Sequence, residues 1–142
     1  MSEAISNLQA AQEKAMAGRP RVGGFPYLAE TLRRAGVTRN VWHLPACASL
    51  YLTRLGNVMQ QGTPLVSGSV DVAPFDERAL VAAIRTDQAG ESTFPQFLLA
   101  AWQAGVVRYE VDFVERHVTY EGSLGESYVE RYPALSVQPG GQ

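Results

Sequence analysis

The sequence has a single cysteine, Cys47, so it can form no internal disulfide and offers too few thiolates for a cysteine zinc site. It has no run approaching the roughly 18 apolar residues of a membrane span. The N-terminal residues SEAISNLQAAQEK lack the basic and apolar regions of a secretory signal. These absences predict a soluble cytoplasmic protein with no membrane partner.

The composition is that of a folded domain. The chain has 142 residues, of which 46% are apolar and 18% are charged, so it can bury one core. The net charge of −2 is unevenly distributed: residues 1–64 sum to +4 and residues 65–142 to −6. Such halves can attract each other within one molecule or between two, or remain solvated surfaces.

The sequence repeats itself at an offset of 69 residues. FPYLAETLRRAGV at 25–37 returns as FPQFLLAAWQAGV at 94–106, and 25–64 aligns with 94–133 without a gap. Ten of the forty aligned positions are identical, well above the roughly 6% that average residue usage produces by chance. We interpret this as an internal duplication.

Each copy predicts two helices. Phe94, Phe97, Leu98 and Ala101 recur at helical spacing, as do their counterparts between 25 and 32. Pro26 and Pro95 suit the first helical turn, and Gly36 and Gly105 suit the helix ends. The upstream segments 9–18 and 81–90 also resemble each other and precede these helices.

After each glycine the apolar period changes to two, which predicts strands. Val107, Tyr109, Val111 and Phe113 alternate with polar residues, VERH forms a hairpin turn, and Ser127 to Glu130 forms another short strand after Gly125. A further strand-like run, Leu65 to Val72, precedes Asp76, which opens the next helix. The expected fold is α+β: two ααββ units in one pseudo-symmetric domain, with helices packed on one side of an antiparallel sheet.

The expected domain therefore spans the whole chain, with repeats at about 8–72 and 76–134 and a flexible tail at 135–142. The copies differ on one strand face, where Glu110, Thr119 and Glu121 correspond to Val41, Leu50 and Leu52. We expect the apolar face of the first copy to be buried, foremost in the domain core and otherwise against a partner subunit or a ligand.

The segment 39–51 is rich in residue types that can take part in catalysis or ligand binding. Cys47 could act as a nucleophile with His43 as its base, because a thiolate needs a nearby base or cation. Arg39, Asn40, Trp42 and Tyr51 could instead line a small-molecule pocket, with Arg39 holding an anionic group. Arg108 occupies the same place in the second copy, so a structural role for the arginine is the alternative.

Two further groups of residues resemble binding sites, but the sequence does not predict a site at either. Glu110, Asp112, His117 and Glu121 resemble metal ligands, but alternating acids on a strand are usually a solvated face, so no metal site is predicted. The loop GRPRVGG at 18–24 fits neither a phosphate-binding loop nor a dinucleotide fingerprint. Nucleic-acid binding is not expected because the chain is acidic and has no basic stripe.

The FP…AGV…Y.VDF…VTY…GE.YVE pattern, which covers about Leu8 to Ala134, resembles the YbcV-like domain-of-unknown-function family, whose members are often labelled phage envelope protein. The resemblance implies no catalytic residues and no cofactor. The leading hypothesis is a non-enzymatic module that binds a small molecule or a protein partner, with a homodimer as one form. The alternatives are a small enzyme that uses Cys47 with His43, and a phage-derived structural protein.

Overall fold

The computed structural model describes residues 2–135 and has two layers. The first half contributes α1 (Glu3–Gly18), α2 (Gly24–Arg34), β1 (Val37–His43), β2 (Ala48–Thr53) and β3 (Val58–Gln61). The second half contributes α3 (Glu77–Gln88), α4 (Phe94–Gln103), β4 (Val106–Asp112), β5 (His117–Gly122) and β6 (Ser127–Arg131). The strands form one antiparallel sheet in the order β3-β2-β1-β4-β5-β6.

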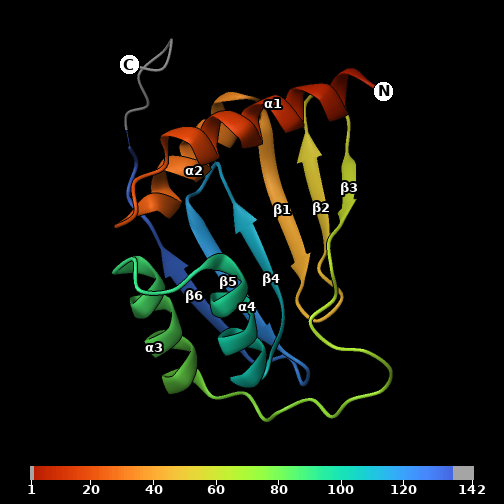
Figure 1. Ribbon diagram of the computed structural model, residues 1–142, viewed down its shortest axis with the longest axis vertical. Helices are drawn as coiled ribbons and strands as arrows, with labels where there is room; N and C mark the ends of the chain where they lie inside the picture. Colours follow the sequence, from red (N-terminus) through yellow and green to blue (C-terminus); the bar gives the residue numbers. More distant parts are fainter. Residues whose placement is uncertain (1, 136–142) are drawn as a thin grey trace.

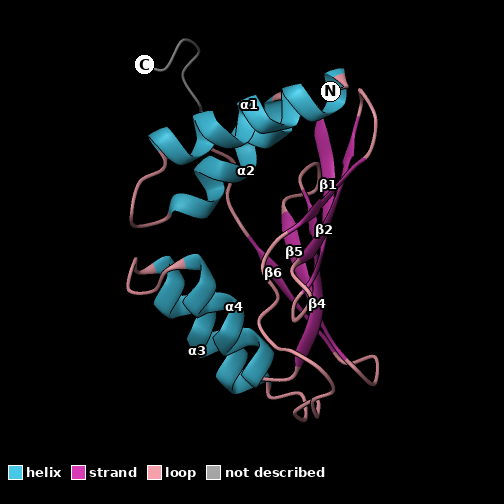
Figure 2. Cartoon of the chain, turned by 45° about the vertical axis from the view of Figure 1, so that its right-hand side comes forward, coloured by secondary structure: helices cyan, strands magenta, loops and turns pink. Residues whose placement is uncertain are grey.

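Both helix pairs cover the same face of this sheet, as the edge-on view in Figure 2 shows. Figure 1 places α1 and α2 near one end of the strands and α3 and α4 near the other. The predicted α+β class and the helices on one side of an antiparallel sheet are confirmed. Each half has a third strand, so the observed unit is ααβββ rather than ααββ.

The helices begin and end at residues that satisfy their free backbone groups. Ser2 and Asp76 cap α1 and α3 by accepting hydrogen bonds from backbone N–H groups, and Thr93 with Gln96 forms a capping box before α4. Gly36 and Gly105 follow α2 and α4 with φ of 94° and 89°, a left-handed conformation that favours glycine.

The buried core lies between the helices and the sheet. It contains Leu8, Leu32, Leu80 and Leu98 from the helices, together with strand residues that face them, among which are Val58, Tyr109, Val111, Val118 and Tyr120. Within residues 2–135 no helix is both long and apolar enough to cross a membrane.

One predicted strand is wrong. Residues 65–72 form no strand but part of an irregular connection between β3 and α3, visible as the long loop in Figure 1. Gly68 in this segment has φ of 68°, a left-handed conformation that interrupts an extended backbone. The predicted flexible tail, 135–142, lies outside the described residues from residue 136 onward.

Candidate functional site

The sheet face opposite the helices, here called the open face, is covered by no helix or strand of the described chain. Side chains alternate along each strand, so every second residue points to this face. In β1 these are Arg39, Val41 and His43, while Asn40 and Trp42 point to the helices. Paired residues of neighbouring strands point to the same face, so the register identifies the open-face residues of the other strands.

The first half of the open face carries an apolar patch, defined as Val41, Leu50, Leu52 and Met59. Val41 lies opposite Leu50, and Leu50 lies opposite Met59, so these three form one row across β1, β2 and β3. Met59 is 61% exposed, and the others are half-buried by their neighbours on the face. The expectation that the domain core buries this apolar face is therefore wrong; its side chains lie on the outer side of the sheet.

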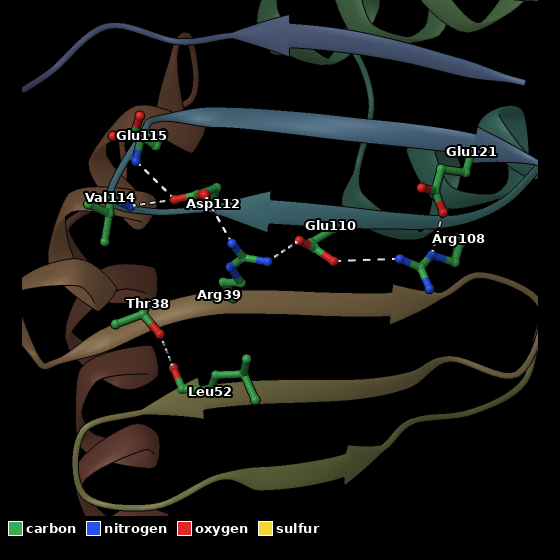
Figure 3. A network of polar contacts seen from close by, with 9 residues as sticks. All are labelled: Thr38, Arg39, Leu52, Arg108, Glu110, Asp112, Val114, Glu115 and Glu121. Carbon is green, nitrogen blue, oxygen red and sulfur yellow. Dashed lines mark hydrogen bonds and ion pairs between the residues drawn. The ribbon is translucent and has the colours of Figure 1, made fainter.

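The open face also carries a charged strip across β1, β4 and β5, defined as Arg39, Arg108, Glu110, Asp112 and Glu121 (Figure 3). Arg39 reaches across from β1 to Glu110, with Nη1 at 2.9 Å from Oε2, and to Asp112, with Nη2 at 3.8 Å from Oδ2. Arg108 pairs with Glu110 at 3.5 Å and with Glu121 at 2.6 Å. The strip is thus an alternating chain of ion pairs at the junction of the two halves.

The acids of the charged strip do not form a metal site. Among residues 2–135 no group of three His, Cys, Asp or Glu side chains could hold a metal ion. Asp112 Oδ1 instead accepts hydrogen bonds from the backbone N–H groups of Val114 and Glu115, which orders the β4–β5 turn. Arginine pairing and turn formation account for these carboxylates.

The predicted ligand pocket of Arg39, Asn40, Trp42 and Tyr51 is not assembled as predicted. Arg39 lies on the open face and is engaged by acids, whereas the other three residues face the helices. Asn40 is buried and donates to Ser49 Oγ at 2.7 Å and to the Leu50 carbonyl. Trp42 stacks on Tyr109 and contacts Phe94 edge-on, so it belongs mainly to the core.

Trp42 does line a cavity of about 350 Å³, together with Cys47, Ser49, Gln60, Gln61 and Gly62. Most polar groups of this cavity already have protein partners. Gln60 exchanges two hydrogen bonds with Gln12, and Gln61 donates to the Ala46 and Gly62 carbonyls. The Trp42 Nε1–H is buried and has no partner among the described residues. Sequence reasoning missed Ser49, Gln60 and Gln61, because polar residues on a strand carry no signal of a cavity.

Cys47 and His43 are not joined by a hydrogen bond within the described chain. His43 is exposed on the open face, whereas Cys47 is 6% exposed in the β1–β2 turn and donates its thiol to the Leu44 carbonyl. Burial raises the pKa of the Cys47 thiol, although a backbone hydrogen bond from Leu65 opposes this in part. A buried thiol with a raised pKa and no adjacent base is a poor nucleophile.

Two mycobacterial proteins are similar to the chain over nearly its whole length. Uncharacterized protein Rv2012 of Mycobacterium tuberculosis (strain ATCC 25618 / H37Rv) is 55% identical over 141 residues, which is 99% of this chain and 85% of the relative. Uncharacterized protein Mb2035 of Mycobacterium bovis matches with the same identity and coverage. No protein-family model matches the chain. The resemblance to the YbcV-like family stays a prediction.

Proposed function

We propose that this chain, which belongs to the family of the mycobacterial proteins Rv2012 and Mb2035, is a protein-binding module that docks a second copy of itself on its open face. The observation that carries the proposal is the apolar patch of Val41, Leu50, Leu52 and Met59 on a sheet face without a covering element. Large contiguous apolar patches on folded domains mark interaction sites, whereas single apolar side chains are ordinary surface.

The charge of the open face favours a second copy as the occupant. Its three arginines, Arg39, Arg108 and Arg131, are balanced by Glu110, Asp112 and Glu121, so the face has no net formal charge when its histidines are neutral. Two such faces do not repel each other as two faces of one sign would. The open face has no net charge to attract a strongly acidic or strongly basic partner.

The arrangement of the open face also suits two-fold symmetry. A two-fold axis between the sheets and perpendicular to the strands stacks each strand over its own copy. The apolar patch then meets itself, and the charged strip meets a strip that runs in the opposite direction. This is an isologous interface, the commonest kind in homodimers. Sheets that pack face to face lie about 10 Å apart, which side chains of this size fill.

The area of the open face is sufficient. Six strands about 4.8 Å apart span about 29 Å, and five to six residues at about 3.3 Å each span about 18 Å, so the footprint is about 500 Å² per copy. Two copies bury about 1,000 Å² in total, which is the threshold for a biological interface and lies below the roughly 1,200–2,000 Å² of stable ones. We therefore expect a dimer whose population depends on protein concentration.

Substitution of Leu50 by glutamate tests the proposal, because it places a charge in the middle of the apolar patch. Leu50→Glu should be monomeric in sedimentation equilibrium at concentrations where the wild type dimerises. The matched control is Leu124→Glu, which changes a leucine that is 88% exposed in the β5–β6 turn and should leave the dimer intact. Circular dichroism checks that both variants fold.

Two results would contradict the proposal: a wild-type protein that stays monomeric over the whole concentration range, or a dimer that survives Leu50→Glu. Assemblies much larger than a dimer would favour the phage-derived structural role instead. The enzymatic alternative requires Cys47 next to His43, and the two side chains share no hydrogen bond in the described chain, so the alternative has no structural support.

A further inference from the structure

A second hollow, of about 290 Å³, lies at the C-terminal end of α2. It is lined by Arg33, Arg34 and Arg54 and by Gly36, Val37, Thr38 and Val114. Three of the seven lining residues are therefore arginines, and none is acidic. We propose that this arginine pocket binds a small oxyanion, with a phosphate group as the chemistry that it fits best.

The charges of the arginine pocket are mostly unbalanced. Arg33 Nη1 lies 3.8 Å from Glu30 Oε2, but the other oxygen of Glu30 is already bonded by Arg116 Nε at 2.7 Å. Within residues 2–135, Arg34 and Arg54 have no carboxylate within 4.0 Å. Arginines that line one hollow with few counter-charges repel each other, and a bound anion relieves this repulsion.

The end of α2 explains only part of this arrangement. Arg33 and Arg34 belong to its last turn, where basic residues interact favourably with the helix dipole. Arg54 comes from a different element, the β2–β3 turn. Its backbone N–H donates a hydrogen bond to the Gly36 carbonyl oxygen, with the two atoms 3.1 Å apart. A methyl group on Gly36 would lie 3.6–3.8 Å from the stem carbons of Arg54, so the stem packs over the backbone of Gly36.

The equivalent place in the second half is filled. Gly105 corresponds to Gly36, and a Cβ at Gly105 would lie 2.5 Å from the Pro74 carbonyl oxygen and 2.6 Å from the Phe75 Cα. The connection between β3 and α3 thus packs directly on Gly105. The first half has the same glycine without such a connection against it, and arginine side chains surround the hollow instead. The two halves therefore differ here in a way that leaves room for a ligand.

The size of the arginine pocket limits the ligand. A volume of about 290 Å³ lies just below the roughly 300–1,000 Å³ that is typical of small-molecule sites, so a phosphate or a small phosphate ester fits and a dinucleotide does not. Arginine binds phosphate through two parallel N–H donors, which makes it the residue best suited to this anion.

The test is titration calorimetry with inorganic phosphate at constant ionic strength maintained with chloride. The wild type should bind with a saturable 1:1 isotherm, and Arg54→Gln should bind at least about tenfold more weakly, because it loses a charge-assisted contact. The matched control is Arg78→Gln, which removes one positive charge from the exposed surface of α3 and should bind as the wild type does.

The same titration with phenyl phosphate shows which kind of phosphate the pocket prefers. Tighter binding of phenyl phosphate than of inorganic phosphate indicates a phosphate ester as the ligand. Tighter binding of inorganic phosphate indicates free phosphate. Either result supports the oxyanion site. Absence of saturable binding to both anions would overturn it, as would an equal loss of affinity in Arg54→Gln and Arg78→Gln. Thermal melting checks that both variants are folded, so weak binding cannot be attributed to unfolding.

Discussion

Val41 and Glu110 lie opposite each other at the centre of the sheet, one on β1 and the other on β4. They are also equivalent positions of the two halves, since 110 is 41 plus 69. The neighbouring pair Arg39 and Asp112 maps by the same offset onto Arg108 and His43, which pair on the other side of Val41. A pseudo-two-fold axis therefore passes between Val41 and Glu110 and relates the two halves of the sheet.

The same symmetry reaches the irregular parts of the inner strands. Register shifts occur at Val37/Arg39 and again at Val106/Arg108. Cys47 and Arg116, which are equivalent by the offset, are the non-glycine residues with positive φ in the described chain. The symmetry of the sheet is an observation, whereas its origin by duplication remains a prediction. At the axis the equivalent side chains are valine and glutamate, and there the apolar patch meets the charged strip.

The paired glycines Gly36 and Gly105 should respond differently to alanine. Both have positive φ, so Gly36→Ala should lower the free energy of unfolding by about 1–2 kcal/mol from backbone strain. Gly105→Ala should lower it by about 1–3 kcal/mol more, because its Cβ meets the backbone of Pro74 and Phe75. Urea unfolding of both variants measures the difference. Equal losses would show that the β3–α3 connection does not pack on Gly105.

The ion pair between Glu30 and Arg116 should stabilise the contact between α2 and the β4–β5 turn. Glu30 is 5% exposed, so loss of its nearest partner leaves a buried carboxylate poorly compensated. Arg116→Met should therefore lower the urea midpoint of unfolding at least about twice as far as Arg39→Met does. Arg39→Met is the control, because it breaks the ion pairs of an arginine whose side chain is half-exposed. Similar small shifts for both variants would show that Glu30 does not depend on Arg116.

Glu130 should make stability depend on pH. Burial by itself raises the pKa of this carboxyl, but hydrogen bonds from Arg85, Tyr128 and Gln88 outweigh it and lower the pKa. A lowered pKa in the folded state means that the stabilisation is present above the ordinary glutamate value of 4.5 and is lost as the pH falls through the folded pKa.

The variant Glu130→Gln tests this dependence, because glutamine keeps the size of the side chain and does not titrate. At pH 7 it should lower the free energy of unfolding by about 1 kcal/mol. The difference from the wild type should shrink below pH 4.5. Urea unfolding at pH 7, 5 and 3.5 provides the comparison, and a difference that stays constant with pH would contradict the prediction.

Cys47 should react slowly with alkylating reagents. Burial raises the pKa of its thiol above the ordinary value of 9.0, so little thiolate exists near neutrality. Iodoacetamide at pH 8 should modify the folded protein at least about tenfold more slowly than the urea-unfolded chain. The unfolded chain is the control for intrinsic reactivity, and rapid alkylation of the folded protein at pH 7 would restore the enzymatic alternative.

Local patterns in the sequence were sufficient for most of the fold. Thr93 and Pro95 mark where α4 begins, Gly36 and Gly105 mark where α2 and α4 end, and alternation predicted β4, β5 and β6. The strand expected at 65–72 failed because a short apolar run does not show whether a sheet edge is available to pair with it. Sequence reasoning identified Val41, Leu50 and Leu52 as an apolar face but assigned it foremost to the core.

The amino-acid sequence by itself determined the helices, most of the strands and the two-fold similarity of the halves, because capping, turn formation and periodicity act over a few residues. Only the tertiary structure decided that the halves join through β1 and β4 and which strand residues point away from the helices. That choice leaves Arg39 and the apolar patch on the outside and brings Arg34 and Arg54 together from different elements. Such contacts depend on which faces pack together, and no local pattern encodes that.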